Sequence, residues 1–228
     1  MLSVLDIFRI GIGPSSSHTV GPMRIARTFV RMLDKAGKLG RTSRVAVELQ
    51  GSLALTGVGH GTVDASILGL MGFAPDRTCP DEAAAALATV HAEKSLDLGG
   101  KMRIDFDPAT DIDLAGHIIP DLHPNGMVLR AYSNDGALLS ERTYFSTGGG
   151  FVASQAQLKR KPEDDRINTG TPVPHDFGSA AELLAICRET GLPIAQLVLA
   201  NEDAFRPQEK TLAGIDRIAA AMDQCIDR

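Results

Sequence analysis

The sequence predicts an α+β fold, in which helices pack on one face of a mixed sheet and an all-helical segment follows. Strand-like and helical segments alternate before about residue 160. A charged, proline-rich stretch without apolar periodicity, KRKPEDDRINTGTPVPHD, comes next and is typical of a linker. Every segment after it has a helical pattern. We therefore expect an α+β domain over residues 1–158, a linker over 159–177 and a helical segment over 178–228.

Four segments of the α+β domain have the two-residue alternation of strands. They are RVAVEL at 44–49, KMRIDF at 101–106, GMVLRAYS at 126–133 and ALLSERTYF at 137–145. The last two flank the residues Asn134, Asp135 and Gly136. This is a hairpin signal, because such residues tolerate positive φ in a tight turn.

Helical patterns in the same domain run over 22–35, 62–70 and 81–98, and Thr62 is a reasonable N-cap for the second. In the C-terminal segment, Ser179 is expected to cap a helix, with Glu182 completing a capping box and Gly191 ending it. Two further helices are predicted at 194–205 and 209–226. Three helices in succession are typical of the start of a larger helical domain, so we expect this domain to be truncated.

Composition and charge exclude several classes of protein. The net charge of −5 argues against nucleic-acid binding, which usually needs a basic surface. No apolar run approaches the roughly 20 residues of a membrane helix, and the first residues lack the pattern of a secretory signal. We therefore expect a cytoplasmic protein. Cys79, Cys187 and Cys225 are too scattered for a disulfide framework or a metal site, and structural roles are expected for them.

The first candidate for chemistry is GIGPSSSHTVGP at 11–22, just before the first long helix. Its hydroxyls and backbone N–H groups precede a helix N-terminus, where anions such as carboxylates are favoured. Ser16, Ser17 and His18 are the polar centre of this segment. A flexible Ser/Gly loop is the alternative, although the flanking prolines favour a rigid one.

The second candidate is GSLALTGVGHGTVD at 51–64, which follows the first strand. His60 lies between two glycines that allow a ligand to approach the backbone, and Thr62 is close behind it. A histidine at such a junction can act as a general base, because its pKa lies near working pH. A loop histidine that is merely exposed remains the alternative.

Two shorter segments complete the candidates. His123 and Asn125 belong to HPNGM, which also reads as an ordinary turn into a strand. Ser146 begins STGGGF, whose glycines can expose backbone amides to an anion or form a hairpin exit. The glycine spacing matches no nucleotide-binding fingerprint.

Taken together, these segments resemble the bacterial iron–sulfur-dependent L-serine dehydratases. The stretches that carry the resemblance are SVLDIFRIGIGPSSSHTVGPMRIA, RVAVELQGSLALTGVGHGTVDASILGLMG, LHPNGM, TYFSTGGGFV and SAAELLAICRETG. They occur in the order and spacing of the family over nearly the whole chain. GPSSSHTVGPM is the most specific of them.

The resemblance implies conversion of L-serine to pyruvate and ammonia, assisted by a [4Fe–4S] cluster and without pyridoxal phosphate. It implies that Ser16, Ser17 and His18 bind the substrate carboxylate. It implies that His60 is the base that removes the α-proton, with Thr62 beside it. The remaining residues expected to line the same pocket are His123, Asn125 and Ser146.

In this family the cluster cysteines lie in the second half of the protein, and no cysteine of this chain matches them. We therefore expect residues 178–228 to be the helical start of a truncated catalytic alpha domain, with no cluster ligands in this chain and no activity of the chain alone. The missing cluster-bearing part of the alpha domain is expected as a partner, in cis or in trans. A homodimer is also expected. The competing hypothesis is a regulatory module that binds serine or another anion, because the front domain also resembles a ligand-sensing α+β module of some phosphoglycerate dehydrogenases.

Overall fold

The computed structural model describes residues 3–8, 10–159 and 171–227. The chain divides into two compact units, one formed by residues 11–160 and the other by residues 1–10 together with 161–228. The first is an α+β unit and the second is a helical unit. Of the predicted linker, residues 160–170 lie outside the described residues.

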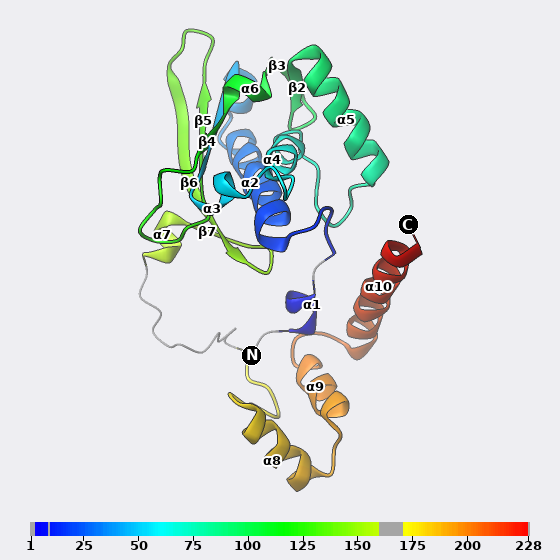
Figure 1. Cartoon of the computed structure of the whole chain (residues 1–228). Helices are drawn as coiled ribbons and strands as arrows, with labels where there is room; N and C mark the ends of the chain where they lie inside the picture. Colours follow the sequence, from blue (N-terminus) through cyan, green and yellow to red (C-terminus); the bar gives the residue numbers. More distant parts are fainter. Residues whose placement is uncertain (1–2, 9, 160–170, 228) are drawn as a thin grey trace. The chain divides into compact units, whose positions relative to one another are not determined.

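A mixed five-stranded sheet organises the α+β unit, which confirms the predicted fold class (Figure 1). The strand order is β4-β1-β5-β6-β7; β1 pairs with β4 in parallel, and the other neighbours are antiparallel. The strands are β1 (Arg44–Gln50), β4 (Ile112–Ala115), β5 (Gly126–Tyr132), β6 (Leu138–Gly148) and β7 (Phe151–Ser154). A separate two-stranded sheet pairs β2 (Ser95–Leu98) with β3 (Met102–Asp105).

Helices cover one face of the large sheet (Figure 1). The helices of this unit are the π-helix η1 (Ser16–Val20), α2 (Gly21–Lys35), the 3-10 turn η2 (Leu39–Arg41), α3 (Ser52–Leu55), α4 (Thr62–Leu70), α5 (Pro80–Glu93), α6 (Pro108–Asp111) and α7 (Gln155–Leu158). Buried side chains of α2 such as Phe29 and Leu33 belong to the same core as Val47, Leu49 and Leu129 of the sheet. Burial of this continuous apolar surface is the main stabilising contribution.

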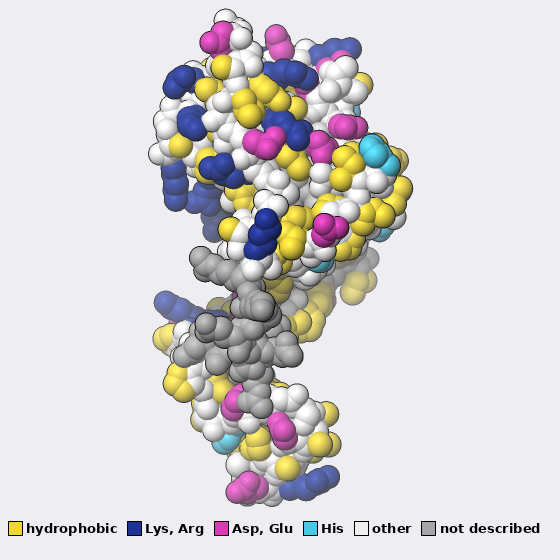
Figure 2. Space-filling model, turned by 90° about the vertical axis from the view of Figure 1, so that its left-hand side faces the viewer, with side chains coloured by type: hydrophobic (Ala, Val, Ile, Leu, Met, Phe, Trp, Pro, Cys, Tyr) yellow, Lys and Arg dark blue, Asp and Glu magenta, His cyan; other side chains and the backbone are white. Residues whose placement is uncertain are grey.

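The opposite face of the sheet is polar. Arg130 of β5 pairs with Glu48 of β1 (3.0 Å) and with Glu141 of β6 (2.6 Å). Figure 2 looks onto this side of the unit, where basic, acidic and hydrophobic side chains are interspersed. A cavity of about 400 Å³ opens beside it, with Gln50 and Lys159 in its lining.

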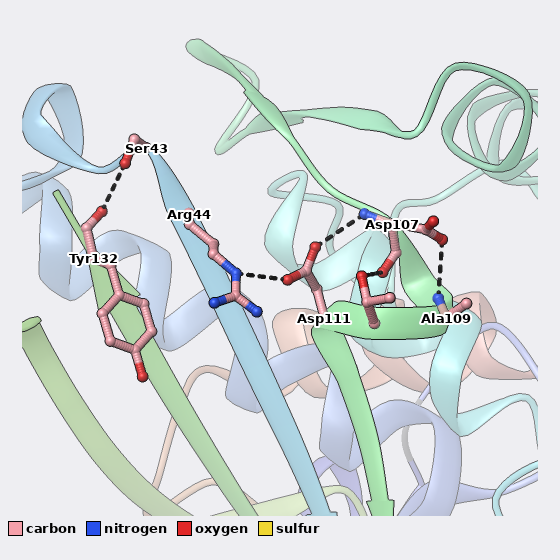
Figure 3. Close-up of polar contacts among 7 residues, drawn as sticks. Ser43, Arg44, Asp107, Ala109, Asp111 and Tyr132 are labelled. Atoms are coloured by element: carbon pink, nitrogen blue, oxygen red, sulfur yellow. Dashed lines mark hydrogen bonds and ion pairs between the residues drawn. The ribbon is translucent and has the colours of Figure 1, made fainter. Parts of the chain in front are cut away.

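A charged cluster ties the start of β1 to its neighbours (Figure 3). Arg44 donates to the Asp111 carboxylate at 2.8 Å, and the same carboxylate accepts from the backbone N–H of Asp107 at 3.0 Å. Ser43, next to Arg44, donates to the carbonyl of Tyr132 on β5. Asp111 is buried and directly precedes β4, so its hydrogen bond to Arg44 holds the start of β4 against β1.

Within the α+β unit, two predictions about helix ends differ from the structure. The helix predicted at 81–98 ends at Glu93, because Lys94 adopts a left-handed conformation (φ 49°) and the next four residues form β2. Thr62 is not the N-cap of α4; Gly61, also left-handed, holds that position, and the Thr62 hydroxyl donates to the carbonyl of His18 instead. The sequence prediction also missed the short strands β4 and β7.

The helical unit contains α1 (Val4–Ile7), α8 (Ala180–Thr190), α9 (Ile194–Glu202) and α10 (Gln208–Asp227). Ser179 caps α8 and Gly191 ends it, as predicted. The capping box is incomplete, because the Glu182 carboxylate accepts from the N–H of Gly178 and not from that of Ser179. The described helices α8–α10 bury only Leu197, Asn201, Glu202 and Thr211.

The N-terminal segment is anchored to this helical unit. The Ser3 hydroxyl and the Val4 N–H each donate to the buried Glu202 carboxylate at 2.7 Å. Arg206 also pairs with that carboxylate. Within the described residues, no single helix is long and apolar enough to cross a membrane; α8 and α9 meet the criterion only as a pair, bent by 98°.

Candidate functional site

The candidate site is built where η1 meets the loops that follow β1 and flank β5 and β6. Ser15 caps η1 by accepting from the N–H of His18 at 3.1 Å, and η1 continues directly into α2. The serine-rich segment is therefore a fixed helical turn and not a slack loop. Ser16 is exposed on this turn, while Ser17 and His18 are partly buried.

Both ring nitrogens of His18 are held. Its Nδ1 lies 2.8 Å from the Ser17 hydroxyl, and its Nε2 lies 2.9 Å from the hydroxyl of Ser52, the first residue of α3. Burial lowers the pKa of His18, and the neighbouring His60 lowers it further, because each would oppose a positive charge on the ring. Both effects favour the neutral ring, and the two hydroxyl contacts hold it in place.

His60 lies against His18, with 5.0 Å between the ring centroids. Its Nδ1 is 2.9 Å from the carbonyl oxygen of Thr56. Because a carbonyl only accepts, Nδ1 carries a proton in this contact, and the lone pair of the neutral ring is on Nε2. The Thr19 hydroxyl donates to the backbone carbonyl of His60 at 2.7 Å and fixes the loop. Nε2 is therefore the atom of His60 that can accept a proton.

Thr62 and Ser146 are both completely buried. The Thr62 hydroxyl donates to the carbonyl of His18, and the Ser146 hydroxyl donates to the carbonyl of Ser17, each at 2.7 Å. Their protons are directed at the backbone of η1, so these contacts place η1 against α4 and β6. Such geometry favours a positioning role for both residues.

The HPNG segment joins the site through Asn125. The Asn125 side-chain amide donates to the backbone carbonyl of Ser146 at 3.1 Å. The backbone carbonyl of Asn125 accepts from the N–H of Ser146 at 3.0 Å. His123 is attached one step further out: its Nδ1 accepts from the N–H of Asn125 at 3.1 Å. Burial lowers the pKa of His123. His123 therefore lies at the periphery of the cluster, where its contact is with Asn125.

Hydrogen bonds and the ring contact join all the predicted residues except Ser16, which is exposed on the same turn. The network also includes three residues that the sequence analysis missed. Ser52, Thr56 and Thr19 all hold the two imidazoles through the contacts given above. Thr19 lies in a segment already singled out, and its signal was the SSSHT run itself. Ser52 and Thr56 also lie in a segment already singled out, GSLALTGVGHGTVD at 51–64, but nothing in its pattern distinguishes these two residues from their neighbours.

The described residues offer no group of three or more His, Cys, Asp or Glu side chains that could hold a metal ion. Cys79 and Cys225 are exposed and Cys187 is half-buried; all three are free thiols. The residues present do not fit an iron–sulfur cluster, which is held by several converging thiolates.

Comparison of the sequence with known proteins identifies the family of the chain. The sequence pattern described as serine dehydratase beta chain matches residues 3–157. The chain belongs to that family. L-serine dehydratase from Streptomyces coelicolor is 41% identical over 227 residues, and L-serine dehydratase TdcG from Escherichia coli is 41% identical over 229 residues. The corresponding protein from Haemophilus influenzae is 33% identical over 228 residues.

The chain matches these relatives along its whole length but spans about half of theirs. The match to the Streptomyces and Escherichia coli proteins covers 100% of this chain and 49% of each relative. The family pattern ends at residue 157, so α8–α10 lie beyond it, although the same relatives still match there. The other half of those relatives has no counterpart in the sequence.

Proposed function

We propose that this chain supplies the substrate-holding half of an L-serine dehydratase, which converts L-serine to pyruvate and ammonia. The observation that carries the proposal is the imidazole pair: His60 lies 5.0 Å from His18, with Nδ1 tied to a carbonyl and Nε2 left as a base. The names of the relatives supply the substrate and the reaction class.

The residues have separate roles in this proposal. Nε2 of His60 removes the α-proton of serine, a general-base step that a positioned imidazole nitrogen can perform. Ser16, Ser17 and His18 bind the substrate carboxylate, aided by the N-terminal end of the continuous η1–α2 helix. The residues Thr62, Asn125, Ser146 and His123 hold and line this pocket.

The proposal assigns the [4Fe–4S] cluster to a separate alpha domain, because the described residues contain no suitable ligand group. When bound in that domain, the cluster would supply the Lewis acid that makes the serine hydroxyl a competent leaving group. Without that domain the purified 228-residue chain should form no pyruvate from L-serine, whether or not iron and sulfide are added. Iron-dependent pyruvate formation by the chain alone would contradict this division of roles.

An exposed apolar stripe on α10 supports the need for such a partner domain. Four large apolar side chains and the small Ala219 recur every three or four residues along the helix. The four large side chains are 38–82% exposed. They are Leu212, Ile215, Met222 and Ile226. An apolar stripe of this kind is usually covered by another helix, so we expect it to be the surface on which the alpha domain packs.

Two neighbouring alanines test this surface with the same chemical change. Ala219 lies in the stripe, whereas the residues three and four positions from Ala220 are all polar, namely Asp216, Arg217, Asp223 and Gln224. Co-expression with the remaining half of the Escherichia coli relative should yield a complex. Ala219→Glu should reduce co-purification at least about ten-fold, because it buries a carboxylate, and Ala220→Glu should not. Equal effects of the two changes would refute the assignment.

The reconstituted complex tests the catalytic role. His60→Gln removes the base while keeping a side chain of similar length, and pyruvate formation should fall by about 10²–10⁴-fold. Serine binding, measured by calorimetry on the same complex, should persist. Full turnover in this variant would exclude His60 as the base, and altered cooperativity with normal turnover would favour the regulatory module instead.

A further inference from the structure

The short helix α3 connects the end of β1 to the loop of His60, and its position is unusually well fixed. Gly51, just before it, has a φ of 51°, and a Cβ there would lie 2.4 Å from the carbonyl oxygen of Pro124. The N–H of Ser52 donates to that same carbonyl at 3.0 Å. Only glycine allows this approach, so the backbone at Ser52 is fixed against the Pro124 carbonyl.

This single turn contacts both imidazoles of the site. At its start, the Ser52 hydroxyl lies 2.9 Å from Nε2 of His18. At its end, the N–H and the hydroxyl of Thr56 donate to the Ser52 carbonyl at 3.1 and 2.9 Å. The Thr56 carbonyl in turn accepts from Nδ1 of His60. Ser52 is therefore linked to one ring through its side chain and to the other through its carbonyl.

We propose that Ser52 is a positioning residue that sets the orientation of His18 against His60. The inference rests on the proposed function, in which these two rings meet the substrate. Ser52 itself contacts no reacting atom in this proposal. Its hydroxyl holds one side of the His18 ring and Ser17 holds the other, so the ring cannot turn without losing a hydrogen bond.

The two rings should respond differently when the Ser52 hydroxyl is removed. His18 loses the partner of Nε2, so its ring should rotate and its tautomer populations should change. His60 keeps its bond to a backbone carbonyl, so its Nδ1–H form should persist. A general loss of structure would disturb both rings alike, which makes the difference diagnostic of positioning.

Imidazole nitrogen NMR on the intact 228-residue chain measures this directly. In the unaltered chain, His60 should carry its proton on Nδ1; a proton on Nε2 would overturn the proposal without any variant. In Ser52→Ala the His18 signals should move and those of His60 should not. Ser52→Thr, which restores a hydroxyl, should return the His18 signals toward their original positions.

Ser43→Ala is the matched control, because Ser43 precedes the other end of β1 and bonds the Tyr132 carbonyl (Figure 3). It should leave both rings unchanged. Unchanged His18 signals in Ser52→Ala, or the same change in the control, would overturn the assignment.

The reconstituted enzyme gives an independent reading. Ser52→Ala should lower kcat by about 10–100-fold, as expected for a misplaced catalytic group, with recovery in Ser52→Thr. Unchanged turnover in Ser52→Ala would count against the proposal. If the unaltered complex made no pyruvate, the proposed dehydratase function would fail, whereas the NMR result would still decide whether Ser52 orients the ring.

Discussion

Gly21, at the junction of η1 and α2, offers a sharp test of the site's architecture. Its backbone is ordinary right-handed helix (φ −58°, ψ −59°), so alanine is conformationally acceptable there. An alanine Cβ would nevertheless lie 2.0 Å from the Ser146 hydroxyl oxygen and 2.8 Å from the Ser146 Cβ. Glycine is required here only because β6 approaches η1 so closely.

The expected cost of Gly21→Ala follows from three contributions. Overpacking a buried contact costs about 1–3 kcal/mol. Displacing the Ser146 hydroxyl from the Ser17 carbonyl costs about 1 kcal/mol more. The better helix propensity of alanine recovers about 0.5–1 kcal/mol. We therefore expect a net loss of about 2 kcal/mol in the free energy of unfolding, or about 4–8 °C in Tm for a unit of this size.

Tyrosine fluorescence during urea unfolding reports this loss for the α+β unit alone. The chain has no Trp, and its two Tyr residues, Tyr132 and Tyr144, lie on β5 and β6. Gly40→Ala is the control, because a Cβ at Gly40 meets no atom within 4 Å; it should change stability by less than about 0.5 kcal/mol. If Gly21→Ala were no more destabilising than the control, the close approach of β6 to η1 would be wrong.

Two further predictions concern charge. Asp111→Asn should cost the α+β unit about 1–3 kcal/mol, because the amide cannot accept as well from both Arg44 and the Asp107 N–H; a loss below about 0.5 kcal/mol in urea unfolding would contradict this role. For His123, burial holds the folded-state pKa below its ordinary value of 6.5. The unfolded chain therefore binds the proton more readily, so this contribution to stability is complete above about pH 6.5 and is lost as pH falls through the folded pKa. His123→Asn retains an acceptor for the Asn125 N–H but does not titrate. The difference between the free energies of unfolding at pH 7 and at pH 5.5 should therefore be smaller in the variant than in the unaltered chain. The same difference in both proteins would show that His123 does not contribute.

The longer strands and helices could be predicted from the sequence, because each contains several repeats of its hydrophobic period. The alternation in RVAVEL and GMVLRAYS places β1 and β5 correctly, and α4 runs over the predicted residues. The short elements could not be predicted, because four residues such as 112–115 contain too little of any period. The error at Lys94 has a different cause: a lysine gave no sign that it would take a left-handed conformation and end α5.

For the site, the sequence indicated which segments matter but not what each side chain does. Ser16, Ser17, His18 and His60 were singled out from composition and resemblance. That Thr62 and Ser146 direct their hydroxyls at the backbone of η1 depends on tertiary contacts between distant segments. Such contacts leave no mark in local periodicity. The same is true of Ser52, which acts through the backbone turn that follows Gly51.

The anchoring of Ser3 and Val4 on Glu202 has a consequence for how the polypeptide can be divided. These partners are separated by 199 and 198 positions, and the first ten residues belong to the same unit as residues 161–228. The α+β unit is thus an insertion within the helical unit, with the chain passing between them twice. A polypeptide beginning at residue 11 would leave the buried carboxylate with two of its donors missing. A natural or engineered division of such a protein would therefore need either to keep the first ten residues with the helices or to replace Glu202 by an uncharged residue.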